Sequence, residues 1–559
     1  MTLSLPFEAL FILYKLQQAG FQAFIVGGAV RDIIIHSLIN LDDKNNKNPP
    51  LVTDYDFTTD ATPEEIQKIF SESFYENEFG MVGVTHENLI EQIKQEIKTT
   101  PQENLQTIVQ AKKETKKEKI IDIKNASKIH EALVQDDQLK EVGQVENQGE
   151  SPLGERGYPG VKNTQTTTQV VHPFEITTFR SDGIYKDFRR PTSVTWGKTI
   201  EEDLERRDFT INSMALAIKE DKLKKLFAQQ KIDKATFQIQ KNDYQLIDLH
   251  DGMKDLTANL VKTVGNPNKR FQEDALRMLR AIRFAVQLNM EIDPAILEST
   301  KANAGLISHI SWERIRDEFL KMLVSDQAKK AIELLDETTL LRYVLPEILE
   351  MKGVDQGGHH TTDVWVHSLD AADNCPSKDP IVRLATLLHD LGKPATYKII
   401  NGQVTAYNHE ILGSRIASKI GKRFRLSKKE LQRLFILVRY HMFYYQPHHT
   451  DAAIRRIMKN VGLENIDDIL DLREGDRLGS GARKTSWRLE ELKQRMIEQL
   501  HQPMDTRDLA INGHDLIKNL GLKPGPKLGE ILNKLLEIVL DEPELNEKAK
   551  LLKKAKKML

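Results

Sequence analysis

The chain has 559 residues, too many for one hydrophobic core, so we expect roughly three or four domains at ~150 residues each. Apolar residues make up 40% and charged residues 29%, a globular composition without any apolar run long enough to cross a bilayer. The 80 Lys and Arg residues balance 82 Asp and Glu residues, which excludes a polycation and restricts nucleic-acid binding to local basic patches. We therefore expect a multidomain cytoplasmic protein that does not contact membranes.

The chain has one cysteine, Cys375. This excludes an intramolecular disulfide and any zinc cluster built from cysteines. Metal chemistry would have to use histidines and carboxylates.

The segment "FIVGGAVRD", residues 24–32, predicts a strand, a Gly27-Gly28 turn and the start of a helix. Free backbone N–H groups at such a start can approach a phosphate, and Arg31 adds a positive charge. A plain structural turn is the more common meaning of this pattern when it stands alone.

Two aspartates follow in "LVTDYDFTTD", residues 51–60, within a run that alternates like a strand. Side chains two apart project from the same face of a strand, so Asp54 and Asp56 would repel each other unless a cation lay between them. Mg²⁺ suits such a pair because it takes oxygen ligands and completes its shell with water and substrate phosphates. The alternative is a solvated strand face.

Residues 86–170 are polar and rich in Lys, Glu, Gln and Thr, which predicts an insertion that is partly helical and partly disordered. The strand-like "PFEITTFR", residues 173–180, follows it and carries Glu175 as a candidate third carboxylate. An ordinary glutamate on an edge strand is the alternative.

The segment "EEDLERRDFTINSMAL", residues 201–216, places Arg207 where it could hold a triphosphate, with Asp208 orienting the guanidinium through a side-on pair.

Next, residues 270–288 predict one helix with an apolar stripe. Asp274, Arg277 and Arg280 line the opposite face of this helix and Arg283 lies at its flank. A carboxylate that accepts and a guanidinium that donates would select cytosine and adenine over uracil and guanine. A plain surface helix would show the same pattern.

Histidines and aspartates are dense after residue 359 and lie near apolar stripes of several predicted helices: His367, His389, Asp390, His409, His441 and Asp476. Such side chains can converge on one or two divalent metal ions. A lone buried histidine is more often a satisfied core residue. Further on, a Gly/Pro turn leads into a helix start near Lys527 that could bind an RNA phosphate or serve as a simple interhelix turn.

Taken together, the segments "VGGAVRD", "DYDF", "FEITTFR", "RRPTSVTWGKTIEEDLERRDFTINSMAL", "FQEDALRMLRAIRFA" and "ISWERIRDEFLKML" resemble bacterial tRNA nucleotidyltransferases of the CCA-adding type, the class shared with poly(A) polymerases. The resemblance covers nearly all of the chain outside the insertion. The His389-Asp390 pair followed by "LGKP" resembles the HD phosphohydrolase domain. The loop at residues 40–53 is longer than is usual in the family.

The resemblance implies roles for individual residues. At the nucleotidyltransferase site it implies Mg²⁺ binding by Asp54 and Asp56, with Glu175 as the third catalytic carboxylate. Base selection falls to Asp274 and Arg277, and the other nucleotide contacts fall to Gly28, Arg31, Arg207, Arg280 and Arg283. At the HD site, His367, His389, Asp390, His409, His441 and Asp476 would bind a divalent transition metal or Mg²⁺.

We thus expect an α+β fold, in which a nucleotidyltransferase head with a small mixed β-sheet and helices precedes an all-α body with a helical HD domain. The expected boundaries are 1–225 for the head, 226–345 for a helical neck that selects nucleotides and binds tRNA, 346–500 for the HD domain, and 501–559 for a helical tail as a candidate tRNA contact. The expected activity is addition of CCA to tRNA 3′ ends from CTP and ATP, with hydrolysis of phosphoesters at the HD domain. The alternatives are a poly(A) polymerase, an enzyme restricted to A or CC addition, and an HD phosphohydrolase with an RNA-binding head. The oligomeric state stays open.

Overall fold

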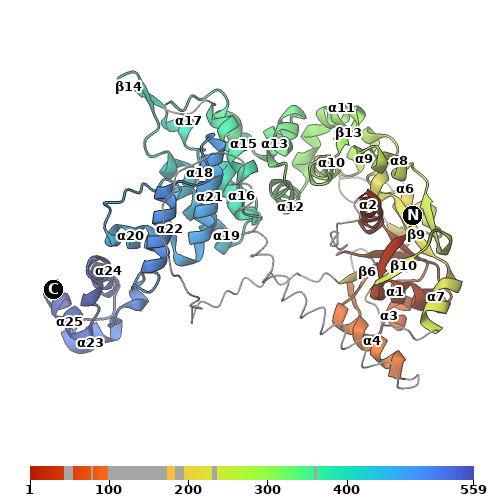
Figure 1. The fold of residues 1–559 in the computed structure, drawn as a ribbon, viewed down its shortest axis with the longest axis horizontal. Coiled ribbons are helices and arrows are strands. Elements are labelled where there is room, and N and C mark those ends of the chain that lie inside the picture. Colours follow the sequence, from red (N-terminus) through yellow and green to blue (C-terminus); the bar gives the residue numbers. More distant parts are fainter. Residues whose placement is uncertain (43–53, 77–79, 99–172, 183–193, 229–235, 358–361) are drawn as a thin grey trace, which may run out of the picture. The chain divides into compact units, whose positions relative to one another are not determined.

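The computed structural model describes residues 1–42, 54–76, 80–98, 173–182, 194–228, 236–357 and 362–559 (Figure 1). The chain forms two compact units. Unit 1 comprises residues 1–184, 191–258 and 262–264, and unit 2 comprises residues 185–190, 259–261 and 265–559. Each is described by itself. In the part of the chain that the structure describes, no helix is both long and apolar enough to cross a membrane.

Unit 1 combines strands and helices. Its strands are β1 (Leu3–Pro6), β2 (Ala23–Val26), β3 (Asp56–Thr59), β4 (Phe74–Glu76), β5 (Met81–Val84), β6 (Phe174–Thr178), β7 (Arg180–Asp182), β8 (Val194–Trp196), β9 (Met214–Ile218), β10 (Thr236–Ile239) and β11 (Tyr244–Asp248). Its helices are α1 (Phe7–Gln18), α2 (Gly28–Asp42), α3 (Pro63–Ile69), α4 (His86–Lys98), α6 (Ile200–Glu205), α7 (Glu220–Ala228) and α8 (Gly252–Thr257), with short 3₁₀ turns at η1 (Thr210–Asn212) and η2 (Lys241–Asp243).

Seven of these strands form one mixed sheet in the order β11-β9-β2-β3-β6-β5-β4. Its pairs are antiparallel except β3 with β6, which run parallel. The central strands are apolar on the side that packs into the core, where Ile25, Phe57 and Ile176 are fully buried. The sheet therefore brings together strands from both sides of the predicted insertion, of which residues 99–172 lie outside the described part.

Unit 2 is almost entirely helical. Its helices are α9 (Pro267–Glu273), α10 (Leu276–Leu288), α11 (Pro294–Asn303), α12 (Trp312–Leu323), α13 (Ala328–Glu337), α14 (Leu341–Val344), α15 (Val364–Asn374), α16 (Pro380–Leu388), α17 (Lys393–Thr396), α18 (His409–Arg423), α19 (Lys428–Tyr440), α20 (Asp451–Val461), α21 (Ile466–Gly479), α22 (Trp487–Gln499), α23 (Gly513–Leu520), α24 (Pro526–Asp541) and α25 (Lys548–Lys556). Its short strands are β12 (Leu260–Val261) paired with β13 (Glu291–Ile292), and β14 (Lys398–Ile400) paired with β15 (Gln403–Thr405). Helices α15, α16, α18, α19 and α21 pack on one another in the middle of this unit.

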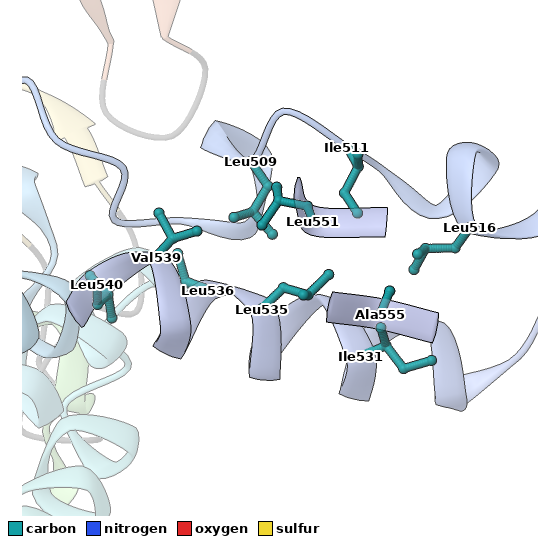
Figure 2. Packing of buried hydrophobic residues seen from close by; sticks show 10 residues of the cluster. All are labelled: Leu509, Ile511, Leu516, Ile531, Leu535, Leu536, Val539, Leu540, Leu551 and Ala555. Atoms are coloured by element: carbon teal, nitrogen blue, oxygen red, sulfur yellow. The ribbon is translucent and has the colours of Figure 1, made fainter. Parts of the chain in front are cut away.

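The last helices have a hydrophobic cluster of their own, drawn in Figure 2. Ile531, Leu535 and Val539 recur along α24 at helical spacing, and Leu551 and Ala555 of α25 pack against them. Asn512 caps α23 by accepting hydrogen bonds from two backbone N–H groups, and left-handed Gly521 ends it. Helix α24 begins at Pro526, next to the start predicted near Lys527.

The expected α+β fold, a mixed sheet with helices followed by a helical body, is confirmed. Two local predictions are wrong. Residues 270–288 are not one helix, because α9 ends at Glu273 and Asp274 has an extended backbone before α10 begins. Asp54 is not inside a strand, because β3 begins at Asp56. Most of the long loop at 40–53 lies outside the described residues.

Candidate active site and metal centre

Asp56 and Glu175 are neighbours in the sheet of unit 1. They are partners in the register of the parallel β3–β6 pair, so their side chains leave the same face of the sheet. The next pair in the register, Phe57 and Ile176, is fully buried on the other face. The sheet thus directs both carboxylates to the face opposite Phe57 and Ile176, with Asp54 exposed just before the strand.

The surroundings of Asp56 disfavour its ionised form. Burial raises the pKa of Asp56, the guanidinium of Arg207 opposes this shift, and the charge on Asp54 adds to it. A divalent cation would relieve this repulsion, so the donor set fits a hard metal ion.

The turn between β2 and α2 lies beside the same carboxylate. Gly27 has a left-handed φ of +71°, and a Cβ added there would stand 2.7 Å from Nη1 of Arg207 and 3.7 Å from Oδ2 of Asp56. Only glycine satisfies both the backbone angle and this close approach. Gly28 then starts α2, where first-turn N–H groups have no helical acceptor.

Arg31, one turn into α2, is almost completely buried. Its Nε and Nη2 donate to Asp32, at 2.7 and 3.0 Å, and its Nη1 donates to Oδ1 of Asn212 at 2.8 Å. These bonds fix the guanidinium near the start of the helix.

Arg207 is held by Asp203. Its Nη2 donates to Oδ2 of Asp203 at 3.0 Å, while Arg206 donates to the other oxygen at 2.6 Å. The Asp203 carboxyl group is completely buried. Burial alone would raise the pKa of Asp203, but the charges of Arg207 and Arg206 outweigh it and the pKa is lowered.

The prediction that Asp208 orients Arg207 is wrong. Asp208 accepts a hydrogen bond from the backbone N–H of Phe209 instead. The spacings from Asp203 to Arg206 and Arg207, three and four residues, were the signal in the sequence for the correct partner.

In unit 2, Asp274 and Arg277 have separate partners. Asp274 accepts from the backbone N–H of Leu276 at 3.0 Å and from Nη2 of Arg314 at 2.8 Å. Arg277 is buried and donates to Glu273 and to the carbonyl of Arg270. The side chains of these two residues thus bond to different partners, while the backbone N–H of Arg277 donates to the carbonyl oxygen of Asp274 at 3.1 Å.

Arg280 and Arg283, one and two turns along α10, share a buried carboxylate. Nε of Arg283 contacts Oε2 of Glu318 at 2.6 Å, and Nη1 of Arg280 lies 3.8 Å from Oε1 of the same residue. Glu318 comes from α12 and, like Arg314 on the same helix, carries no sequence signal for this contact.

The six predicted HD residues converge in unit 2, and each is less than one tenth exposed. His367 lies on α15, His409 begins α18 and Asp476 lies on α21, while His389, Asp390 and His441 lie directly after α16 and α19 rather than within helices. The residues form two groups that could each hold a metal ion: His367, His389 and Asp476, and Asp390, His409 and His441.

Asp390 lies between the two groups. Its Oδ2 is 3.4 Å from Nε2 of His367 and 3.2 Å from Nε2 of His389. Its Oδ1 is 3.3 Å from Nε2 of His409 and 3.7 Å from Nε2 of His441. One carboxylate can therefore bridge two ions. Lys393, which the sequence analysis did not assign, contacts Oδ2 at 2.6 Å.

Three of the histidines have their other ring nitrogen engaged by the backbone. Nδ1 of His389, His409 and His441 lies 2.7 to 2.8 Å from the carbonyl oxygen of the residue three positions earlier. A carbonyl can only accept, so Nδ1 donates and leaves the Nε2 lone pair directed toward the centre. This is the tautomer that a metal ion requires.

The electrostatics of this centre are strongly perturbed. Burial lowers the pKa of His441 to about 3. For His389 burial also lowers the pKa, but the charge of Asp390 outweighs it and the pKa is raised. Neutral imidazoles and ionised carboxylates are the forms that bind metal ions, and this donor set fits one or two divalent ions.

Glycines bring the contributing elements together. A Cβ on Gly479 would lie 2.6 Å from the backbone N of Ala371 and 2.8 Å from the carbonyl oxygen of His367, and one on Gly475 would lie 2.6 Å from the carbonyl oxygen of Ala371. Helix α21 can therefore pack directly on the backbone of α15. A Cβ on Gly392 would lie 2.0 Å from the carbonyl oxygen of His409.

Four family models match the chain. They describe the poly A polymerase head domain (residues 23–139 and 154–262), the RNA and SrmB-binding site of polymerase A (289–352), the HD domain (357–474) and domain 2 of tRNA nucleotidyltransferases (418–555). Nucleotidyltransferase and HD families generally use divalent metal ions, and the two metal-binding groups found among the described residues both consist of HD residues.

Known proteins resemble the chain over most of its length. A CCA-adding enzyme of Ligilactobacillus salivarius is 27% identical over 99% of this chain and 96% of its own. The A-adding tRNA nucleotidyltransferase of Deinococcus radiodurans is 31% identical over 60% of this chain and 75% of its own. The crystal structure of the Bacillus stearothermophilus CCA-adding enzyme in complex with CTP has the same fold, with a TM-score of 0.58 at 22% identity, covering 99% of this chain and 96% of the other. The chain therefore belongs to the tRNA nucleotidyltransferase family that contains the CCA-adding and A-adding enzymes.

Proposed function

We propose that this protein adds C, C and A to tRNA 3′ ends from CTP and ATP and releases pyrophosphate. The observation that carries this proposal is the Asp56–Glu175 pair, aligned by the β3–β6 register beside the Gly27 turn and Arg207. The tRNA 3′-hydroxyl oxygen would form a bond to the α-phosphorus of the nucleotide while the bond to the leaving pyrophosphate breaks. The names of the relatives, CCA-adding enzyme in the first case, support the substrates.

Asp54, Asp56 and Glu175 would hold Mg²⁺. When bound, this ion would activate the tRNA 3′-hydroxyl group and neutralise negative charge on the phosphate. The backbone N–H groups after Gly27, at Gly28 and onward, would receive the phosphates, and Arg207 would hold their charge. Asp203 keeps Arg207 in position for that contact.

Asp274 and Arg277 would select the base by accepting from the exocyclic amino group and donating to the ring nitrogen of cytosine or adenine. Asp274 is bonded to Arg314 and Arg277 to Glu273, so these side chains would exchange protein partners for the base. Arg280 and Arg283 remain proposed nucleotide contacts.

The test is incorporation of labelled CTP and ATP into tRNA that lacks its 3′-terminal CCA. Sequential addition of C, C and A is expected, with no product from UTP or GTP. Failure to incorporate CTP would overturn the proposal. Addition of A alone to tRNA ending in CC would support the A-adding alternative, which the relationship to the Deinococcus radiodurans protein motivates.

For the buried histidine cluster we propose metal-assisted hydrolysis of phosphomonoesters or cyclic phosphodiesters, including those at RNA 3′ ends. Water would form a bond to phosphorus as the bond to the alcohol oxygen breaks, and the alcohol leaves with a proton. The cluster offers four imidazoles and two carboxylates, which favours a divalent transition metal over Mg²⁺. Lys393, whose Nζ contacts Oδ2 of Asp390, would neutralise negative charge on the phosphate.

We keep the division into head (1–225), neck (226–345), HD domain (346–500) and tail (501–559) as a proposal. The lysines of α25 that point to solvent, including Lys553 and Lys556, support a tRNA contact by the tail. The proposed substrates place the activity in the cytoplasm.

A further inference from the structure

A cavity of about 580 Å³ lies beside the histidine cluster. Its walls come from the segment around Gln356, from α17, from the β14–β15 hairpin with the residues after it, and from Met442 directly after His441. We propose that this hairpin pocket binds the base and ribose of a nucleotide whose phosphate lies at the histidine cluster, and that Tyr407 is the surface on which the base stacks. The inference rests on the phosphohydrolase activity proposed above.

One end of the hairpin pocket coincides with the histidine cluster. His409 and Lys393 both line the pocket, and Nζ of Lys393 lies 2.6 Å from Oδ2 of Asp390 and 2.7 Å from Oε1 of Gln356. Among the described lining residues Lys393 is the one Lys or Arg side chain. Positive charge is therefore confined to the end where a phosphate would meet the metal ligands.

Aromatic side chains also line the pocket. Tyr397 and Tyr407 flank the β14–β15 hairpin, and the Tyr407 side chain is 73% exposed. Two residues later, His409 is only 6% exposed. Between them Asn408 has a left-handed φ of +64°, a backbone angle that Asn tolerates better than most residues and that turns the chain from the hairpin into α18. A base has a flat π face, and stacking on an aromatic side chain is the usual way proteins hold it.

The remaining walls suit hydroxyl and amino groups rather than further phosphates. Asp355 and Glu410 contribute carboxylates, which repel anions but accept hydrogen bonds from ribose hydroxyls or exocyclic amines. Glu410 is fixed by Arg439 at 3.3 Å. The volume is far larger than a phosphate needs and lies within the range of ~300–1,000 Å³ usual for small-ligand pockets. A nucleoside carrying one phosphate matches all three features.

The test compares Tyr407→Ala and Tyr407→Phe in the full, metal-loaded chain. Hydrolysis of 3′-AMP and of glycerol phosphate, which has no base, is measured for each variant. In Tyr407→Ala the ratio of kcat/KM for 3′-AMP to that for glycerol phosphate should fall on the order of tenfold, mostly through KM, because one stacking contact is lost. Tyr407→Phe should restore the ratio. Tyr444→Ala is the matched control, since Tyr444 is 69% exposed but does not line the pocket.

An unchanged ratio in Tyr407→Ala would overturn the hairpin pocket and leave the hydrolase proposal standing. If neither compound is hydrolysed, the proposed phosphomonoester hydrolysis fails, and binding of 3′-AMP measured by ligand-observed NMR decides on the pocket. Weaker binding to Tyr407→Ala than to Tyr444→Ala supports the pocket, and equal binding overturns it. An oligonucleotide with a 3′-phosphate, run in parallel, distinguishes an RNA end from a free nucleotide as the ligand.

Discussion

Asp203 shows how one buried carboxylate can fix two arginine side chains, one of which, Arg207, is a proposed nucleotide contact. It is completely buried, yet it is ionised because Arg206 and Arg207 donate to its two oxygens. Removing one partner of such a group leaves the others as uncompensated charges in a poorly solvated place. The position of Arg207 beside Gly27 therefore depends on a residue that does not approach the reacting atoms.

We expect Asp203→Asn to destabilise unit 1 by about 3 kcal/mol, because the amide removes the charge that Arg206 and Arg207 surround. KM for the nucleotide should rise as Arg207 loses its orientation. Urea-dependent hydrogen exchange of peptides from β9 and α6 measures the first effect and steady-state nucleotide addition the second. Glu202→Gln, on the exposed side of the same helix, is the control. Unchanged exchange in Asp203→Asn would contradict this role.

The same carboxylate predicts a pH dependence. The folded pKa of Asp203 is lower than its ordinary value of 3.8, so below that value the unfolded chain binds more protons than the folded one. The stabilisation is fully present above about pH 5 and is lost progressively as the pH falls through 3.8 toward the lowered folded value. Between pH 5 and 3 the stability of unit 1 should fall more steeply in the wild type than in Asp203→Asn.

Asp56 lies closer to the chemistry. Asp56→Asn keeps the shape of the side chain but removes a negative charge from the proposed ion site, and we expect nucleotide addition to fall on the order of 10³-fold. Because burial and Asp54 both make this charge unfavourable, the variant should be as stable as the wild type or more stable. Thermal unfolding together with CTP incorporation checks both parts. Retained incorporation would contradict the metal assignment.

At the scale of elements, close packing of α15 and α21 positions two proposed metal ligands, His367 and Asp476. Gly479 of α21 lies against the backbone of Ala371 and His367, and Asp476 lies one turn before it on the same helix. Nε2 of His367 and Oδ1 of Asp476 are 3.2 Å apart in the structure. Separating the two helices would lengthen this distance.

Gly479→Ala adds only one methyl group, but we expect it to weaken metal binding strongly. The added Cβ would meet backbone atoms 2.6 to 2.8 Å away, which cannot rotate aside, and we expect a loss of about 2 kcal/mol in stability. Metal titration by calorimetry should show lower affinity, with nucleotide addition unaffected. Gly481→Ala is the control for backbone strain. Gly481 has a left-handed φ, which strains an alanine, but no atom lies within 4 Å of the added Cβ.

The sequence predicted most of the elements because their signals are local. Strand β2, the Gly27-Gly28 turn and the start of α24 were readable from alternation, glycine pairs and proline. Asp274 shows where such signals fail, since the residues around it favour a helix and the break comes from its bonds to the N–H of Leu276 and to Arg314, forty residues away. Partners of that kind depend on tertiary packing and leave no periodic pattern in the sequence.

The candidate sites divide in the same way. The identities of the six HD residues could be listed from the sequence, but the central position of Asp390 and its contact with Lys393 could not. The role of Asp203 could have been predicted from the sequence, because Arg206 and Arg207 follow it by three and four residues, the spacing of neighbours on a helix. The hairpin pocket had no signal in the sequence, since its walls come from four separate parts of the chain.

At the scale of the whole molecule, the two proposed metal sites belong to different compact units. Asp56 lies in unit 1 and His389 in unit 2, each with its own core. Substitutions at distant sites without shared partners act additively.

We expect His389→Ala to abolish phosphoester hydrolysis and leave CTP incorporation within about twofold, while Asp56→Asn does the reverse. The double variant should lose both activities to the same extent as the single variants, in keeping with additivity. Parallel assays on the same preparations measure this. Loss of incorporation in His389→Ala, with the chain still folded by circular dichroism, would show that the units are coupled.

Asp390 has a thermodynamic consequence for metal uptake. Each of its oxygens faces a different group of imidazoles, so two ions bound there would share a single ligand. Occupancy of one position would then change the affinity of the other, and by reciprocity the reverse would hold to the same degree. The binding isotherm would depart from that of two independent ions, and the proposed hydrolysis would depend on the two ions jointly rather than on each separately.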